Sequence, residues 1–168
     1  MFRTLKNYYW QRKCLVVLVK LVLQRVTKAK VIINNQQYAS IGNGILLLIG
    51  IEPEDEKLNL DYYIKKILNL RIFNDQNNKM NNSLLDIHGS ILVVSQFTLL
   101  ADLSRGNRPS FINAAQPKLA QKLYDKFIKK LKGYEINVEQ GRFGAQMFLD
   151  FINDGPVTII MDGKNEKN

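Results

Sequence analysis

The chain has 168 residues, 46% of them apolar, and a formal charge of +9 at pH 7. Ten glycines and four prolines exclude a collagen-like or disordered chain. Chains of this length bury roughly 70% of their unfolded surface, so one domain with a single core is expected. The positive charge favours a polyanionic partner, but it does not separate nucleic acid from an anionic membrane surface or from plain solubility.

Cys14 is the only cysteine and His88 the only histidine. A lone cysteine excludes an internal disulfide framework and a cysteine-rich zinc site, and a lone histidine excludes a histidine-built metal cluster. We therefore expect no metal ion and no other cofactor. The lone cysteine also favours a reducing compartment, and we expect the cytoplasm. No stretch reaches the roughly 18 apolar residues that a membrane span requires.

Residues 1–18 differ from the rest of the chain. They carry basic and aromatic residues but no acidic one, and a short apolar run that Lys20 interrupts closes the segment. No small-residue cleavage site follows, which argues against a signal peptide, whereas an organellar transit peptide remains an alternative. We interpret residues 1–18 as a leader outside the fold, 19–162 as the domain and 163–168 as a polar tail.

The first elements in chain order are strands. Residues 21–27 alternate apolar and polar positions near their end, as in a half-buried strand, and residues 31–33 continue it. Asn34-Asn35 is turn chemistry for a hairpin into residues 36–38. Residues 44–51 form a continuous apolar run next to glycines, which predicts a strand buried on both faces.

The middle of the chain mixes a helix, a strand and two loops. Residues 55–70 have apolar positions at helical spacing, with acidic residues early and basic residues late, which suits the helix dipole. Residues 74–82 are dense in Asn and Asp and predict a loop or hairpin tip. Residues 90–99 predict a second long apolar strand, and residues 102–111 predict a loop.

The last third predicts one helix and three strands. Pro117 begins a helix whose apolar stripe runs up to Gly133. Two helices among about seven strands, largely in hairpins, indicate an α+β domain with a mostly antiparallel sheet. The three strands are expected at residues 135–140, 145–153 and 157–161, with Asp154-Gly155-Pro156 connecting the last two.

Familiar catalytic motifs are absent from the sequence. It contains no glycine-rich dinucleotide or phosphate loop and no serine nucleophile elbow. His88 is interpreted as a turn residue, although a serine esterase built on Ser95 and His88 stays an alternative. Cys14 is a weaker nucleophile candidate because it lies in the leader. Glu52 and Glu54 are interpreted as helix caps and solvated charges, so catalysis would have to use backbone donors, hydroxyls or the substrate itself.

Two short motifs carry a more specific signal. Ser95-Gln96-Phe97-Thr98-Leu99 and Asn153-Asp154-Gly155-Pro156-Val157-Thr158 resemble the paired signatures of the D-aminoacyl-tRNA deacylase family. The resemblance covers about residues 19–161 and implies an α+β fold with a barrel-like, mostly antiparallel sheet and two main helices. It also implies a homodimer that binds the aminoacylated 3′ end of tRNA. Supporting matches in the same order are Leu23-Gln24-Arg25-Val26, Arg105-Gly106-Asn107-Arg108-Pro109-Ser110-Phe111 and Gly141-Arg142-Phe143.

The resemblance implies a gate at Gly155-Pro156. In the family this pair forms a cis peptide that enters the partner subunit's active site and rejects L side chains by shape. The alternative is a simple turn between strands, since cis bonds are the minority for X-Pro. Arg25 is implied to brace the gate, unless it is only an exposed strand residue. The implied substrates are D-aminoacyl-tRNA and, as an extension, glycine mischarged on tRNA-Ala.

The resemblance places Ser95, Gln96, Phe97 and Thr98 on the catalytic wall opposite the gate. Backbone amides near Gln96 and Phe97 would hold the aminoacyl group and stabilise a developing oxyanion. Thr98 has no neighbouring base that could activate its hydroxyl. We therefore expect Thr98 to position the substrate, while the terminal ribose hydroxyl and a water move the protons.

Further residues are implied to contact the tRNA. Phe111 and Met147 would line the adenosine end of the pocket, or equally belong to the core. Contacts to phosphates would position tRNA without reading its sequence. The rival function is a non-catalytic RNA-binding module that uses its basic surface alone. The candidates for phosphate contacts are Lys28, Lys30, Arg105 and Arg108.

Overall fold

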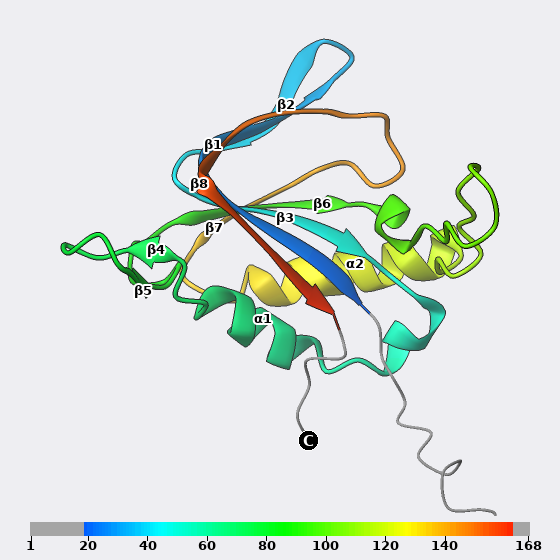
Figure 1. Cartoon of the computed structure of the whole chain (residues 1–168), viewed down its shortest axis with the longest axis horizontal. Coiled ribbons are helices and arrows are strands. Elements are labelled where there is room, and N and C mark those ends of the chain that lie inside the picture. Colours follow the sequence, from blue (N-terminus) through cyan, green and yellow to red (C-terminus); the bar gives the residue numbers. More distant parts are fainter. Residues whose placement is uncertain (1–18, 163–168) are drawn as a thin grey trace, which may run out of the picture.

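The computed structural model describes residues 19–162 (Figure 1). The predicted leader and the predicted tail lie outside the described residues. The β-strands are β1 (Lys20–Ile33), β2 (Gln36–Ile41), β3 (Gly44–Gly50), β4 (Phe73–Asn74), β5 (Met80–Asn82), β6 (Ser90–Ser95), β7 (Asn137–Gln140) and β8 (Phe148–Asp162). The α-helices are α1 (Leu60–Leu68) and α2 (Pro117–Leu131), and the 3-10 helices are η1 (Pro53–Lys57) and η2 (Phe97–Leu100).

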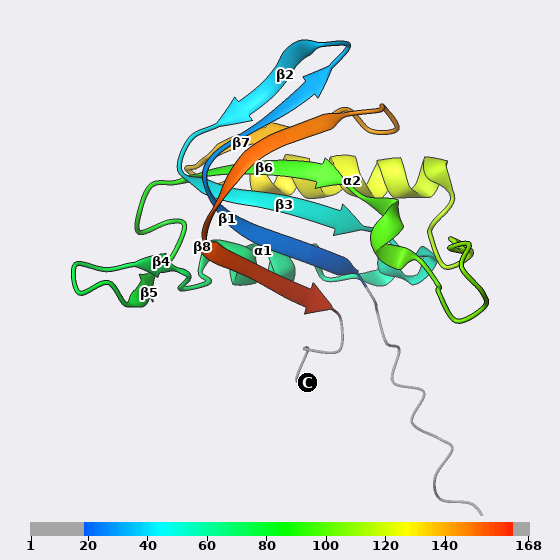
Figure 2. The same cartoon turned by 45° about the horizontal axis from the view of Figure 1, so that its top comes forward.

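Strand β1 organises the main sheet. One of its edges pairs antiparallel with β3 and then with β2, and its other edge pairs antiparallel with β8. Strands β3, β6 and β7 run parallel to one another, because α1 lies in the connection from β3 to β6 and α2 in the connection from β6 to β7. Both helices cover one face, and β2 bends over the opposite face, which makes the sheet barrel-like (Figures 1 and 2). The predicted α+β fold with two main helices is confirmed.

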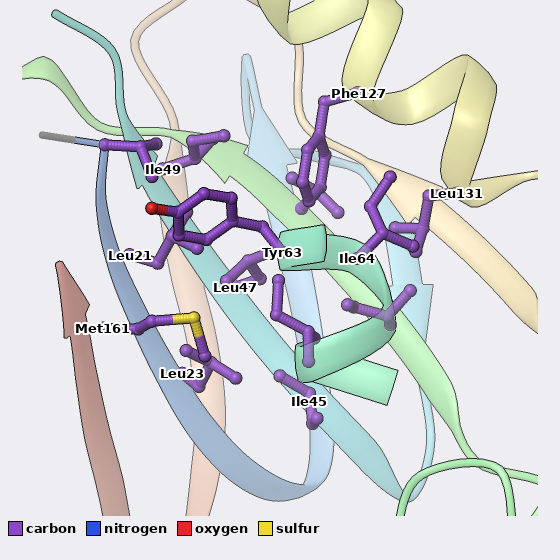
Figure 3. Packing of buried hydrophobic residues seen from close by; sticks show 14 of the residues in the cluster. Leu21, Leu23, Ile45, Leu47, Ile49, Tyr63, Ile64, Phe127, Leu131 and Met161 are labelled. Carbon is purple, nitrogen blue, oxygen red and sulfur yellow. The ribbon is translucent and has the colours of Figure 1, made fainter. Parts of the chain in front are cut away.

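Alternating side chains of the sheet enter two cores. Successive strand residues point to opposite faces, so Ile45 and Leu47 of β3 pack under the helices while Leu46 packs inside the curl of the sheet. Each fully buried side chain of this size contributes roughly 1.5–3 kcal/mol. The core under the helices includes Leu21, Leu23, Ile45, Leu47, Ile49, Tyr63, Ile64, Phe127, Leu131 and Met161 (Figure 3).

Several predicted elements agree with the structure. Asn34 and Asn35 form the two-residue hairpin loop with φ of 51° and 60°, the left-handed geometry that such a loop requires and that asparagine tolerates. Strand β3 is buried on both faces, as its apolar run predicted. Helix α2 begins at Pro117. Within residues 19–162, no helix is long and apolar enough to cross a membrane.

The predicted helix over residues 55–70 is wrong at both ends. The segment first forms η1, where the carboxylate of Asp55 accepts the backbone N–H of Glu52 at 2.7 Å. Helix α1 starts only after Asn59, whose side chain accepts the backbone N–H of Tyr62. One run of helical periodicity therefore forms two short helices, η1 and α1, and each has its own N-cap. Glu52 is the N-cap of η1, as the sequence indicated.

Three predicted strands also differ from the structure. The apolar run over residues 90–99 leaves the sheet at Ser95 and turns into η2. Residues 148–153 and 157–161 belong to one strand, β8, because β1 pairs with both segments, while residues 145–147 precede the strand. Asp154-Gly155-Pro156 is therefore an irregularity within a strand, opposite a shift of register at Gln24–Val26, and not a connection between two strands.

Candidate active site

A cavity of about 570 Å³ opens at the carboxyl end of β6. Its walls come from the end of β6, the start of η2, the start of α2 and residues 143–149. The volume lies within the range of roughly 300–1,000 Å³ that is usual for small-molecule sites. Such a cavity can enclose one small organic group, for example an amino acid attached to a nucleoside.

The end of β6 is shaped by its contact with β3. The backbone N–H of Gln96 donates to the carbonyl of Ile49 at 2.8 Å, and η2 follows directly. Gly50 permits this close approach, because a Cβ there would lie 3.2 Å from Leu99 Cβ and 3.3 Å from the carbonyl oxygen of Gln96. The first N–H groups of a helical turn have no acceptor within the turn, so the start of η2 supplies backbone donors beside the cavity.

Five of the predicted site residues line this one cavity. Ser95, Gln96 and Phe97 come from the β6–η2 junction, and Phe111 and Met147 come from segments distant in the sequence. The rings of Phe97 and Phe111 meet edge to face with centroids 4.9 Å apart. Phe97 is nevertheless 56% exposed, so part of its aromatic surface is open to a ligand.

Thr98 lies beside the cavity but is not among the residues that line it. Its side chain is exposed, and its hydroxyl oxygen accepts a hydrogen bond from the side-chain amide of Gln96. The contact fixes the orientation of Gln96, which does line the cavity. The role expected for Thr98, positioning the substrate, stays a prediction.

The described wall of the cavity carries no titratable side chain; its polar side chains are those of Ser95, Gln96 and Gln116. His88 is an exposed turn residue with φ of 49° that precedes β6, whereas Ser95 ends that strand. A six-residue strand spans roughly 20 Å. The alternative of a Ser95–His88 esterase is therefore wrong, and Cys14 lies outside the described residues.

The Gly155–Pro156 peptide bond is cis, as the resemblance implies. It lies opposite Arg25, which pairs with Ile45, and Ile45 in turn pairs with Ile91 near the start of β6. The cavity, in contrast, lies at the other end of β6. Within one chain, the predicted gate and the predicted catalytic wall are therefore apart.

Arg25 is buried, with 6% of its surface exposed, so the alternative of an exposed strand residue is wrong. Its Nε donates to the carbonyl of Asp154 at 3.3 Å and pairs with the Asp154 carboxylate at 3.0 Å. Its Nη1 donates to the carbonyl of Ile72 at 2.7 Å and to Asn74 Oδ1 at 3.2 Å. No local pattern indicated Ile72 or Asn74, because they meet Arg25 only through the tertiary fold.

Tyr124 of α2 is a second contributor that the sequence did not indicate. Its hydroxyl donates to the carbonyl of Val93 at 2.8 Å, and burial raises the pKa of this phenol. Its ring lies 5.9 Å from that of Phe143, which lines the cavity. Helix α2 thereby holds the loop that forms one cavity wall.

The predicted phosphate contacts fall into two groups. Lys30 forms an ion pair with the Asp150 carboxylate at 2.9 Å, so its charge is partly neutralised. Lys28, two residues earlier on the same strand, is exposed. Arg105 and Arg108 are exposed on the loop that ends just before Phe111 of the cavity. Neither arginine lines the cavity, so their contact with phosphates stays a prediction.

The fold and the cavity define an α+β protein with a neutral, partly aromatic binding site at a strand end. A family model described as D-Tyr-tRNA(Tyr) deacylase matches residues 22–162. The chain is 48% identical over 146 residues to a D-aminoacyl-tRNA deacylase of Thermosipho africanus (strain TCF52B), covering 87% of this chain and 98% of that protein. The chain belongs to the D-Tyr-tRNA(Tyr) deacylase family and is a hydrolase of aminoacyl-tRNA esters.

Two solved structures have the same fold as this chain. A c-Myc DNA unwinding element binding protein superposes with a TM-score of 0.79 at 42% identity, covering 84% of this chain and 97% of that one. A probable eukaryotic D-amino acid tRNA deacylase superposes with a TM-score of 0.76, covering 86% of this chain and 99% of that one. At 20% identity, the second likeness supports the fold alone.

Proposed function

We propose that the cavity binds the aminoacyl group of a D-aminoacyl-tRNA and that the ester to the terminal ribose is hydrolysed there. Water adds to the ester carbonyl, the bond from that carbon to the ribose oxygen breaks, and the proton from water ends on the ribose oxygen. Free D-amino acid and tRNA are the products. The observation that carries the proposal is the Ser95-Gln96-Phe97 wall of a cavity without acidic or basic side chains.

Backbone donors supply the catalysis in this proposal. N–H groups at the start of η2 stabilise the oxyanion that forms when water attacks, and one such donor is worth about 2.7–4 kcal/mol. The neutral cavity keeps these dipoles effective, because no side-chain charge lies on its described wall. The ribose hydroxyl next to the ester and a water carry the proton, while Thr98 orients Gln96.

The stereochemical filter comes from a second copy of the chain. Gly155 and Pro156 lie away from the cavity of their own chain, so they can act only on another protomer's cavity. Strand β8 favours such a dimer: within residues 19–162 it pairs with β1 alone, and it exposes Phe148, Ile152 and Ile160 by 60%, 49% and 69%. Apolar side chains on an unpaired edge strand are typical of an interface. A two-fold contact would complete both cavities.

A wall of main chain facing the α-carbon explains the specificity. It clashes with an L side chain but leaves room for a D side chain or for the hydrogen of glycine. The filter does not depend on the identity of the side chain, so we propose a broad range of D-amino acids. The same filter would also admit glycine mischarged on tRNA-Ala, which we propose as a further substrate. We place this reaction in the cytoplasm.

Deacylation of D-Tyr-tRNA and L-Tyr-tRNA tests the function. We expect rapid release of D-tyrosine and slow release of L-tyrosine. Release of neither would contradict the proposal and favour a basic RNA-binding module, whose affinity would fall steeply with salt. Release of both at similar rates would contradict the filter alone.

A mixing experiment tests the second copy. A Gly155→Ala chain and a Phe97→Pro chain, which loses a backbone donor at the first position of η2, are each expected to be nearly inactive in homodimers. After joint refolding, mixed dimers contain one cavity with neither defect, and D-Tyr-tRNA hydrolysis is expected to reappear. No recovery, despite mixed dimers shown by mass spectrometry of differently tagged chains, would contradict the cross-subunit filter.

A further inference from the structure

Arg25 joins two segments that are distant in the sequence. Its Nη1 donates to Ile72 O at 2.7 Å and to Asn74 Oδ1 at 3.2 Å. Its Nε lies 3.3 Å from the carbonyl oxygen and 3.0 Å from the carboxylate of Asp154. One buried guanidinium therefore connects the start of the β4–β5 hairpin to the irregularity in β8 that carries Gly155.

The hairpin that carries Asn74 is fixed by its own side chains. The carboxylate of Asp75 accepts two backbone N–H groups of the loop at 2.8 and 3.0 Å, and it also accepts the side-chain amide of Asn81. Arg71 donates to the carbonyl and to the side-chain oxygen of Asn81, at 2.7 and 2.9 Å. The hydrogen bond from Asn81 lowers the pKa of Asp75, so this acceptor stays charged at neutral pH.

Asn74 itself is held from the opposite strand. Its backbone carbonyl accepts the side-chain amide of Asn82 at 3.0 Å, while its side-chain oxygen faces Arg25. The amide oxygen is therefore presented from a braced backbone. A side chain whose hydrogen-bond partners are fixed cannot shift freely, so the position of Asn74 determines the position of the Arg25 guanidinium.

We infer that Asn74 is a positioning residue for the Gly155–Pro156 segment, acting through Arg25. The inference rests on the proposed function, in which this segment excludes L side chains by shape. Exclusion by shape is sensitive to small displacements, since a wall that retreats slightly admits the excluded group. The hairpin would thus set stereochemical specificity without touching the substrate.

The competing interpretation is a purely structural asparagine in a hairpin. Under that interpretation, replacing Asn74 changes the stability of the protein but leaves the preference for D over L substrates unchanged. The ratio of kcat/KM for D-Tyr-tRNA to kcat/KM for L-Tyr-tRNA therefore separates the two interpretations. Stability alone does not.

The test compares Asn74→Ala and Asn74→Gln with wild type by this ratio. We expect both substitutions to lower it by about tenfold, the effect of losing one hydrogen bond to a charged group. The loss should come from faster cleavage of L-Tyr-tRNA. Asn74→Asp keeps an acceptor for Arg25 and should restore most of the ratio. Because Gln retains the polar amide and only moves it, the test holds even if the alanine variant fails to fold.

Asn77→Ala is the matched control, since Asn77 contributes its backbone N–H to the same loop and lies exposed at its tip. It should keep the wild-type ratio. An unchanged ratio in folded Asn74→Gln, or an equal loss in Asn77→Ala, would overturn the inference. A wild-type protein without a D preference would overturn the proposed function instead, so the two failures are distinguishable.

Discussion

Arg25 and Asp154 form an ion pair of 3.0 Å in which the arginine side chain is 7% exposed and the aspartate side chain 43% exposed. The same arginine also donates to the Asp154 carbonyl, so it contacts both the side chain and the backbone. The contact therefore holds the main chain next to Gly155 and adds little as a charge pair alone. The main effect of the contact is to fix the position of the backbone at Asp154.

Arg25→Lys should separate charge from geometry. Lysine keeps the charge, but its single ammonium group cannot reach Ile72, Asn74 and Asp154 with the planar fork of arginine. We expect the free energy of unfolding to fall by about 1–3 kcal/mol, the cost of leaving buried polar groups unpaired. Urea unfolding measures this change. The D-to-L ratio should fall at the same time, and a variant with wild-type stability and ratio would contradict the role of Arg25.

Gly155→Ala should disturb the segment directly. Gly155 has φ of 116°, and a Cβ there would lie 2.7 Å from Val157 Cγ2 and 3.0 Å from Arg25 Nη2. We expect a loss of about 1–3 kcal/mol in the free energy of unfolding from backbone strain, together with loss of deacylation. Gly42→Ala is the control, because nothing lies within 4 Å of a Cβ at that position. Equal stability of the two variants would show that the segment tolerates a side chain.

Thr98→Ala should leave turnover of D-Tyr-tRNA within a few-fold of wild type. The hydroxyl oxygen accepts a hydrogen bond from Gln96 and has no base beside it among the cavity-lining residues described. Single-turnover kinetics, with substrate binding measured in parallel, check this expectation. Complete loss of turnover with intact binding would instead make Thr98 a chemical participant.

Asp55 should make the stability of the protein depend on pH. The residue is 2% exposed; burial raises the pKa of its carboxyl to about 7, and its Oδ1 has no hydrogen-bond partner among the described residues. The folded state therefore holds a proton that the unfolded state releases near pH 4. This contribution to stability is present at low pH and is lost as the pH rises towards 7.

Asp55→Asn should remove that part of the pH dependence. The amide oxygen can still accept the backbone N–H of Glu52, which the carboxylate now accepts at 2.7 Å. The free energy of unfolding, measured in urea at pH 5 and pH 8, should differ less between the two pH values in the variant than in wild type. Burial also raises the pKa of Glu52, so some dependence should remain. If the free energy of unfolding changed equally between pH 5 and pH 8 in both proteins, the assignment of this pH dependence to Asp55 would be wrong.

Local patterns were enough for the elements that depend on their own residues. The Asn34-Asn35 turn, the proline start of α2 and the burial of β3 on both faces all follow from backbone preferences and hydrophobic patterns at short range. The Ser95-Gln96-Phe97 wall was also identified from sequence, because its motif resembles a known family. Each of these features is contained in a few consecutive positions. The two separate cores were not expected, because the length of the chain predicted a single one.

Only the tertiary structure decided which distant segments meet. The burial of Arg25, its bonds to Ile72 and Asn74, and the union of two predicted strands into β8 all depend on pairing partners far away along the chain. Hydrophobic periodicity reports which face of a segment is buried, but it does not report which neighbour covers that face. Strand pairing and guanidinium contacts are set when the whole sheet closes, so Ile72 and Asn74, the partners that hold Arg25, could not be identified from any single segment.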